Sequence, residues 1–317
     1  IHCCHFDIYY SWIFMDHEPS QLQYDARVYS IGKKFMLKTY YLLTKPGIIA
    51  GNLITTSSAF ILASRERVDY LLFLWTVLGL FGVIASACVI NNYIDREADS
   101  KMERTKRRPL VMGSISPKHA LFFAFFLAIF GFWILWQHTN VWAVSAAFAG
   151  FFIYADLYSF WKYWHATAIF VGSIAGAMPP IVGYSAANGR IDMGALIVFS
   201  LLVLWQMPHF FSISMYRAKE YTGASIPVFP ETKGLLVTKF YILGYTTAFF
   251  GAALLPTFYG LCGFSYLYVA IPLSLAWVYL SLKGFNVSND HVWARQMFIC
   301  SLVVIMGISF ALPFSSV

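Results

Sequence analysis

The sequence predicts an all-α, polytopic membrane protein, and its composition and its long apolar runs are the observations that predict this fold. Of the 317 residues, 59% are hydrophobic and 12% are charged, and the mean hydropathy is +0.64. The apolar residues form continuous runs, whereas a membrane β-barrel would show short segments of alternating hydrophobicity. Nine runs approach about 20 residues, the length that crosses the hydrocarbon core as a helix. In order they cover residues 47–64, 70–92, 119–137, 140–160, 166–186, 194–215, 235–256, 264–282 and 295–314.

The net charge of +7 is explained mostly by the topology of the chain in the membrane, and not by binding to nucleic acid. Lysine and arginine gather in the connections after the even-numbered runs, which is the distribution of cytoplasmic loops. We therefore expect the N-terminus and residues 91–110 to face the cytoplasm. The connections after even-numbered runs hold Arg96, Lys101, Arg104, Lys106, Arg107, Arg108, Lys118, Lys162, Arg217, Lys219, Lys233, Lys239, Lys283 and Arg295, and the opposite connections hold Arg65, Arg67 and Arg190.

Residues 1–35 differ from the rest of the chain. Their apolar run is short and broken, and they lack the basic region and cleavage site of a signal peptide. We expect a non-core N-terminal extension over residues 1–35, either disordered or translated from upstream of a native start at Met36, and a membrane domain over residues 36–317. A protein that begins at Met36 is then expected to match the full chain in activity and thermal stability in purified membranes. A clear loss of either on truncation would show that residues 1–35 are structural.

The stretch NNYIDREADSKMERTKRRPL, residues 91–110, follows the second apolar run directly. Asn91, Asp95 and Asp99 are four residues apart, so a helix that continues beyond the membrane would stack them on one face. Two carboxylates stacked in this way repel each other unless a cation lies between them. Mg²⁺ prefers oxygen ligands and is commonly held by one or two carboxylates together with substrate phosphates. The stripe predicts catalytic metal ligands for a Mg²⁺-diphosphate site; the alternative is a solvated loop whose basic residues only set topology.

A second polar connection, residues 204–234, follows the sixth apolar run. Gln206 and His209 lie inside that run, where polar side chains are costly and mark candidate functional sites. Arg217 and Lys219 follow, and Glu220 supplies another carboxylate. For His209, the alternative to a substrate-binding role is an interior histidine bonded to a neighbouring helix.

These stretches resemble the UbiA-type intramembrane prenyltransferases. The aspartate stripe alone is typical of the whole superfamily, whereas WQMPH, IPVFP and MERTKRRPL together indicate its haem-modifying branch, the protohaem IX farnesyltransferases (haem O synthases). The matching stretches are TKPGIIAGNL (44–53), NNYIDREADSKMERTKRRPL (91–110), GSIAGAMPPIVGY (172–184), LWQMPHF (204–210) and KEYTGASIPVFPETKG (219–234).

The resemblance implies a nine-helix bundle around a central cavity with cytoplasmic cap loops, in the bacterial inner (plasma) membrane. It implies transfer of a farnesyl group from farnesyl diphosphate to a vinyl group of haem B, giving haem O. Mg²⁺ is then the cofactor, and haem B is a substrate and not a permanent cofactor. The implied partners are the two substrates and the lipid bilayer, with a haem A synthase or terminal oxidase assembly downstream and no nucleic acid.

The resemblance also assigns roles to residues at matching positions. Asn91, Asp95 and Asp99 are expected to be catalytic. The diphosphate is expected to contact Lys45, Arg104, Arg108, Lys162, Arg217 and Lys219; the haem or the cavity wall is expected to involve Asn52, Tyr158, Gln206 and His209; and the metal is expected to bind Asn91, Asp95, Asp99 and Glu220.

Two departures from the family pattern leave alternatives open. Many members carry a second D-x-x-x-D after the sixth span, where this chain has only Glu220, so a second protein-held Mg²⁺ is in question. The family usually shows Lys-Arg five and six residues after the tyrosine that corresponds to Tyr158, where this chain has Tyr163 and Trp164 and places Lys162 one position earlier. Either Lys162 takes over that contact through a one-residue helical shift, or the contact is missing.

Two other functions are weighed beside this one. Another UbiA-type polyprenyltransferase, of the class that modifies quinone precursors, would share the aspartate stripe but carry a second acidic pair and no WQMPH. A membrane transporter would be expected to show an internal repeat and interrupted helices at the midplane. No such repeat is visible in the sequence, and the polar residues gather at one end of the predicted spans.

Overall fold

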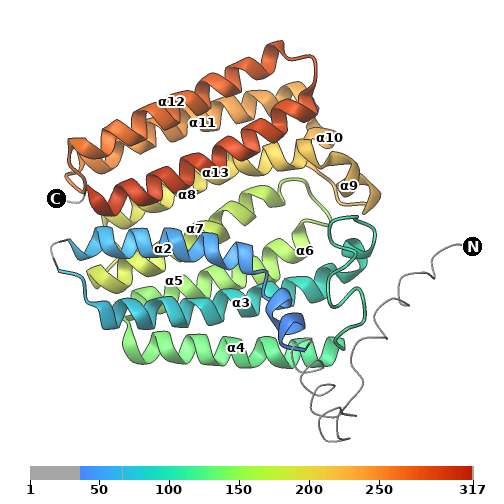
Figure 1. The fold of residues 1–317 in the computed structure, drawn as a ribbon, viewed down its shortest axis with the longest axis horizontal. Helices are drawn as coiled ribbons and strands as arrows, with labels where there is room; N and C mark the ends of the chain where they lie inside the picture. The colour runs from blue at the N-terminus through green and yellow to red at the C-terminus, as the bar shows by residue number, and fades with distance from the viewer. Residues whose placement is uncertain (1–35, 66, 316–317) are drawn as a thin grey trace, which may run out of the picture. The chain divides into compact units, whose positions relative to one another are not determined.

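The fold of the protein is given by a computed structural model, which describes residues 36–65 and 67–315. The residues from Leu42 onward form one compact unit. Among the described residues, nine helices are long and apolar enough to cross a membrane, and there is no β-strand (Figure 1). The prediction of an all-α integral membrane protein with nine spans is confirmed. The predicted extension over residues 1–35 lies outside the part of the chain that the structure describes.

The spans follow one another with short connections, and two of them are built from several helical pieces. Two short helices, α9 (Ala218–Gly223) and α10 (Phe229–Lys233), lie between the sixth and seventh spans. In chain order the spans are α2 (Pro46–Ser64), α3 (Tyr70–Ser100), α4 (Pro117–His138), α5 (Val141–Phe152) with the π-helix η1 (Ile153–Tyr158) and α6 (Ser159–Trp161), α7 (Ala168–Asn188), α8 (Met193–Tyr216), α11 (Leu235–Phe258), the 3₁₀ turn η2 (Phe264–Tyr266) with α12 (Leu267–Lys283) and the 3₁₀ turn η3 (Gly284–Asn286), and α13 (Asp290–Phe314).

Side-chain caps fix where several of the spans begin. Asp69, Asn140 and Asp192 each accept two backbone N–H groups from the first turns of α3, α5 and α8. Ser116 and Asn289 cap α4 and α13 through one backbone N–H each. Because the first N–H groups of a helix have no partner within it, such caps satisfy them where the chain turns back into the membrane.

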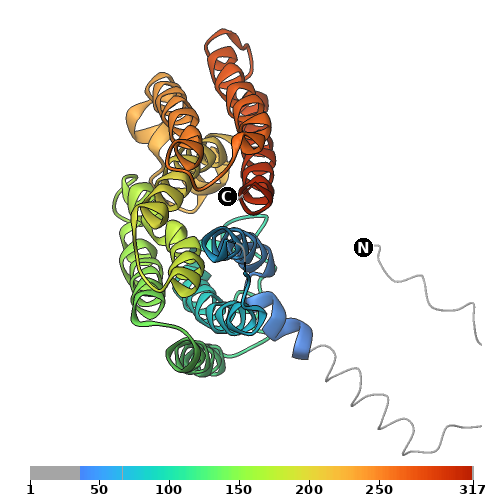
Figure 2. The same cartoon turned by 90° about the vertical axis from the view of Figure 1, so that its left-hand side faces the viewer.

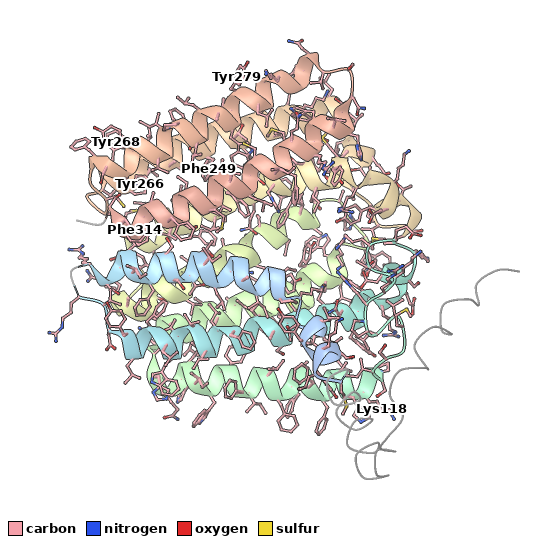
Figure 3. The ribbon with its side chains drawn as sticks, viewed as in Figure 1. Lys118, Phe249, Tyr266, Tyr268, Tyr279 and Phe314 are labelled. Carbon is pink, nitrogen blue, oxygen red and sulfur yellow. The ribbon has the colours of Figure 1, made fainter. Side chains whose placement is uncertain are left out.

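The outer surface of the bundle is apolar, as contact with lipid requires. Figure 3 shows Tyr268 and Tyr279 pointing outward from α12, and both are more than half exposed. By contrast, Phe249 of α11 is fully buried and packs edge-on against Trp277 of α12, with ring centroids 5.5 Å apart. A water-soluble monomer rarely exposes apolar patches of this extent, so the exposed side chains face the bilayer.

Glycines let the two best-packed helix pairs approach closely. On α4, a Cβ added at Gly131 would lie 2.6 Å from the Gly79 carbonyl oxygen and 2.6 Å from the Val83 nitrogen of α3. On α7, a Cβ at Gly183 would lie 2.3 Å from the Thr56 carbonyl oxygen of α2. In membranes the hydrophobic effect does not drive helices together, so their association depends on close van der Waals packing. Small residues at the contact permit that packing. These pairs hold α2, which carries Asn52, and α3, which carries Asn91, Asp95 and Asp99.

Three polar connections lie at the same end of the bundle. The segment after α3, the segment after α6, and α9 with α10 all lie on the right-hand side in Figure 1, and Figure 2 shows the same helices from one end. Ala98 in the last turn of α3 and Met102 just after that helix pack with Ala224 and Ile226, which lie between α9 and α10, in a small apolar cluster. This cluster joins the two polar connections into one cap over the end of the bundle.

Candidate active site

The acidic stripe lies buried on α3. This helix continues to Ser100, so the predicted extension of the second span through both aspartates is confirmed. Asp95 is 8% exposed and Asp99 is 2% exposed. Lys162 Nζ lies 2.6 Å from the Asp95 carboxylate, and Arg108 Nη1 donates to Asp99 Oδ2 at 2.5 Å. Buried carboxylates must be paired to remain ionised, and these basic side chains supply the pairing.

A third cation approaches the same face of α3. Lys45 donates a hydrogen bond to Asn91 Oδ1. Burial lowers the pKa of Lys45 to about 8, and repulsion from Arg108 contributes to the shift. Lys45 also has a left-handed backbone, with φ at 53°, directly before Pro46. A residue with a side chain resists this conformation, so its presence at the start of α2 marks a position held by its surroundings.

Hydrogen bonds from the fourth span orient the stripe further. Asn91 Nδ2 donates to Ser159 Oγ at 2.9 Å, and the Ser159 hydroxyl donates to the Tyr154 carbonyl oxygen at 2.8 Å. Tyr163 donates its hydroxyl to Asp95 Oδ1 at 2.8 Å. Burial raises the pKa of Tyr163, and the Asp95 charge raises it further, so this hydroxyl stays protonated and acts as a donor. The amide of Asn91 therefore presents its oxygen toward Lys45 and away from Ser159.

The structure answers the question about the missing Lys-Arg pair. Lys162 reaches Asp95 although it stands one position earlier than the family pattern, and it also lies 5.4 Å from the centre of the Tyr158 ring. The preceding turns, Ile153–Tyr158, form the π-helix η1. A π turn carries one more residue than an α turn, so it changes the face on which the following residues project. Lys162 therefore reaches the acidic stripe from its earlier position, and its contact with a substrate phosphate stays a prediction.

The connection after α8 brings a third acidic group to this end of the bundle. Arg217 Nη1 donates to Glu220 Oε1 at 2.6 Å. The second oxygen of Glu220, Oε2, is buried and has no hydrogen-bond partner among the described residues. Lys219 is exposed on α9 and forms no ion pair with any described residue. The geometry thus places Arg217 and Glu220 together and leaves Lys219 at the surface.

Tyr221 of α9 packs against the apolar cluster that joins the first and third polar connections. Burial raises its pKa, while the nearby charges act in both directions: Arg104 and Arg217 lower it, and Glu220 and Asp95 raise it. These charges come from the first and third polar connections, which the apolar cluster of Ala98, Met102, Ala224 and Ile226 packs together. The residues predicted from two distant motifs therefore gather at one site.

A cavity of about 610 Å³ lies beside this site within the bundle, and neither the acidic stripe nor the basic side chains bonded to it form part of its wall. Its wall is mainly apolar and aromatic, with Tyr154, Phe210 and Phe298 among the lining residues. The polar residues predicted to bind haem or form the cavity all line it, and so does one of the predicted diphosphate-binding residues. These are Asn52, Tyr158, Gln206 and His209, together with Arg104.

Two glycines on α7 make room for polar groups in the cavity wall. Gln206 donates through Nε2 to the carbonyl oxygens of Ser173 and Leu202, at 3.1 and 3.2 Å. A Cβ at Gly176 would lie 2.1 Å from Gln206 Oε1, and a Cβ at Gly172 would lie 2.9 Å from the Tyr158 ring. Two glycines four residues apart therefore form the surface against which Gln206 and Tyr158 are placed.

The donor set fits a magnesium ion that binds together with a diphosphate. No group of three His, Cys, Asp or Glu side chains converges within residues 36–65 and 67–315, so these residues form no metal cage of their own. Asn91, Asp95 and Asp99 nevertheless present one amide oxygen and two carboxylates on one helix face. Mg²⁺ is usually held by one or two carboxylates plus substrate phosphates and water, and such a site needs no third acidic ligand from the protein.

The comparison with known families decides the classification. The model of the UbiA prenyltransferase family matches residues 52–303. The chain belongs to this family. As a UbiA-family member it is a prenyltransferase, and the nine spans among its described residues make it an integral membrane protein.

Several relatives of this UbiA-family chain are named protoheme IX farnesyltransferase. The relative from Protochlamydia amoebophila (strain UWE25) is 48% identical over 282 residues, which cover 89% of this chain and 100% of that protein. The relative from Cronobacter sakazakii (strain ATCC BAA-894) is 46% identical over 275 residues, which cover 86% of this chain and 93% of that protein.

Solved structures share the fold at lower identity. A structure from work on digeranylgeranylglyceryl phosphate synthase in membranes matches with a TM-score of 0.74 and 19% identity, over 88% of this chain and 98% of that chain. A UbiA homolog from Archaeoglobus fulgidus, bound to GPP and Mg²⁺, matches with a TM-score of 0.67 and 15% identity, over 87% of this chain and 99% of that chain. At these identities the likeness establishes the fold.

Some residues of the site have no signal in the sequence. Ser159, which holds Asn91, is one of many serines and stands 68 positions away from it. Ser301, which contacts His209, stands 92 positions away in the last span. Tyr163 contacts Asp95 directly, whereas the family pattern has no tyrosine at that position. Contacts of this kind depend on which helices become neighbours, and only the folded structure shows that.

Proposed function

We propose that this UbiA-family protein transfers the farnesyl group of farnesyl diphosphate to a vinyl group of haem B and produces haem O. The observation that carries the proposal is a cationic, acidic site beside an apolar cavity. In the site, Lys162 and Arg108 pair with buried carboxylates and Lys45 bonds to Asn91, and the cavity has His209 on its wall. The cationic end suits a diphosphate, and the aromatic cavity suits two large apolar substrates. The relatives named protoheme IX farnesyltransferase support the same substrates.

The basic residues bind the leaving group. Lys45, Arg108 and Lys162 are already directed at the stripe, and Arg104 lines the cavity beside it. As the bond between farnesyl C1 and oxygen breaks, negative charge grows on the diphosphate, and these donors stabilise it. Mg²⁺, held with the diphosphate by Asn91, Asp95 and Asp99, supplies further neutralisation of that charge when bound. On binding, the cations now paired with the carboxylates turn to phosphate oxygens.

The cavity protects the reactive carbon. Loss of diphosphate leaves an allylic cation, which early access of water would convert to farnesol. Tyr154, Tyr158 and Phe210 line the cavity and exclude water, and aromatic faces stabilise a nearby cation. The electron pair of the haem vinyl group then forms the new carbon–carbon bond. The resulting cation beside the porphyrin ring takes up water and releases a proton, which leaves the hydroxyethylfarnesyl group.

The third polar connection completes the site. We assign Arg217 and Lys219 to the outer oxygens of the diphosphate, and Glu220 to a second metal ion. The support for Glu220 is its buried, unpartnered Oε2, which a cation would satisfy. The pairing with Arg217 gives the alternative, in which Arg217 neutralises Glu220 and one Mg²⁺ suffices.

The membrane and its orientation belong to the same proposal. The basic connections after α3, α6, α8 and the span of α12 support a site that faces the cytoplasm. The bacterial sources of the relatives support the inner (plasma) membrane of a bacterium. Farnesyl diphosphate would then enter from the cytoplasmic side, and haem from the cytoplasm or bilayer. A haem A synthase or a terminal oxidase assembly is the expected user of the product.

Extraction of haem from cells with and without the gene tests the proposed function. Chromatography should show haem O, more hydrophobic than haem B, only where the gene is present. Unchanged haem composition, together with loss of a prenylated quinone precursor, would instead identify the alternative aromatic polyprenyltransferase.

Replacement of His209 is expected to change the affinity for haem and not the affinity for farnesyl diphosphate. Replacing it with Ala should weaken haem affinity about tenfold and slow transfer, because an imidazole that contacts haem positions the vinyl group for attack. The affinity for a non-hydrolysable farnesyl diphosphate analogue should stay the same. The two ligands are titrated separately against purified wild-type and variant protein. An interior histidine with only a packing role would instead lower thermal stability and weaken both affinities together.

A further inference from the structure

Ser301 of α13 contacts the cavity histidine from outside the cavity. Its side chain is fully buried, and its Oγ lies 2.7 Å from His209 Nδ1 on α8. The same oxygen lies 2.5 Å from the carbonyl oxygen of Phe298, one turn earlier on α13. His209 lines the cavity, whereas Ser301 is not among the residues that do.

These two contacts determine the tautomer of His209. A serine hydroxyl carries one hydrogen, and a carbonyl oxygen can only accept. If that hydrogen pointed to His209 Nδ1, the Ser301 oxygen and the Phe298 carbonyl oxygen would face each other at 2.5 Å with no proton between them. Both contacts are hydrogen bonds only when Ser301 donates to Phe298 and Nδ1 of His209 donates to Ser301. The proton of the neutral imidazole is therefore on Nδ1, and Nε2 carries a free lone pair.

Aromatic rings hold the imidazole in this orientation. The Trp205 ring stacks on His209 with centroids 4.7 Å apart and an interplanar angle of 25°. Phe298 lies with its centroid 5.0 Å from that of His209. Trp205 in turn donates its Nε1 hydrogen to the carbonyl oxygen of Ser301 at 2.7 Å. One residue of α13 thus fixes both the histidine and the ring stacked on it, and Nε2 forms no hydrogen bond with any described residue.

We propose that Ser301 is a positioning residue that holds His209 in the Nδ1–H form, so that Nε2 is the atom presented to the iron of haem. This inference rests on the proposed function, since it takes haem as the substrate that enters the cavity. An imidazole that donates from one nitrogen to a fixed acceptor and keeps the other free is the usual form of a metal-ligating histidine. With the iron held at Nε2, the macrocycle keeps one position in the cavity and can turn only about the iron–nitrogen axis, so the vinyl groups stay within a fixed distance of the iron site beside the farnesyl carbon.

Titration of purified full-length protein with ferric protohaem IX tests the proposal through the Soret band and the spin state of the iron. Wild type should bind saturably with a histidine-ligated spectrum, and His209→Ala should lose that spectrum. Ser301→Ala should weaken haem affinity about tenfold and give a mixed spectrum, because the ring can then flip or change tautomer. Ser301→Thr keeps the hydroxyl, so its haem affinity and its spectrum should match those of the wild type. Affinity for the farnesyl diphosphate analogue should be equal in all of them.

Control variants distinguish a specific role of Ser301 from a general loss of stability. Ser274→Ala, at a fully buried serine of α12 whose Oγ forms no hydrogen bond with the part of the chain that the structure describes, should leave the haem titration unchanged. If Ser301→Ala does not fold, Ser301→Cys keeps the shape with a weaker acceptor and should show the same loss. A wild-type haem affinity and spectrum in Ser301→Ala or Ser301→Cys would overturn the role of Ser301, and a wild-type spectrum in His209→Ala would overturn ligation by Nε2. Failure of the wild type to bind haem at all would instead reject haem as the substrate, and the proposed function with it.

Discussion

Asp95→Asn and Asp99→Asn are each expected to lower haem O formation at least about 100-fold in purified membranes, while the protein still inserts and folds. Asparagine keeps the shape of the side chain and removes its negative charge. Both carboxylates are buried beside cations, so the loss weakens the metal–diphosphate complex and leaves Lys162 or Arg108 without its counter-ion. Chelation by EDTA should likewise stop the wild type, and added Mg²⁺ should restore it.

A double variant distinguishes metal binding from a structural ion pair. In Asp99→Asn with Arg108→Met, neither charge of the pair is left buried alone, so the thermal stability lost in Asp99→Asn should largely return. Activity should stay low, because both the metal ligand and a phosphate donor are gone. Normal turnover by Asp95→Asn would reject the assignment of the stripe. Recovery of activity in the double variant would show that the pair serves stability alone.

The spans and the acidic stripe could be predicted because both depend on short-range patterns. A run of about 20 apolar residues has no other stable place than the bilayer. Asn91, Asp95 and Asp99 share a face on any helix, so the prediction needed only the continuation of α3, and that helix runs to Ser100. The main difference in the spans is their length, since several helices extend a turn or two beyond the apolar run.

The fine positioning of the site could not be predicted, because it depends on which helices become neighbours. Lys162 stands where a sequence pattern places no cation, and the π turn before it and the packing of α6 bring it to Asp95. Lys219 has the expected charge at the expected place, yet it is exposed on α9. Sequence fixes the kind of side chain at each position, but the direction in which it projects depends on local helix geometry.

Gly131→Leu is expected to destabilise the bundle by about 3 kcal/mol or more, or to prevent its folding. Even a single Cβ at this position of α4 would lie 2.6 Å from two backbone atoms of α3, and backbone cannot move aside as a flexible side chain can. The two helices would have to separate along their contact. Because α3 carries Asp95 and Asp99, any protein that still folds should also lose activity. Thermal denaturation in detergent and the yield of monodisperse protein measure the effect.

Gly244→Leu is the matched control for this prediction. Gly244 lies in the membrane-spanning helix α11, is exposed on the outside of the bundle, and has no atom within 4 Å of an added Cβ. Leucine there would point into lipid and favours helix by roughly 0.5–1 kcal/mol over glycine, so stability should stay the same or rise. If both leucine variants lost stability equally, the cost would come from the loss of glycine as such. If Gly131→Leu matched the wild type, α3 and α4 would not be in the close contact that positions the acidic stripe.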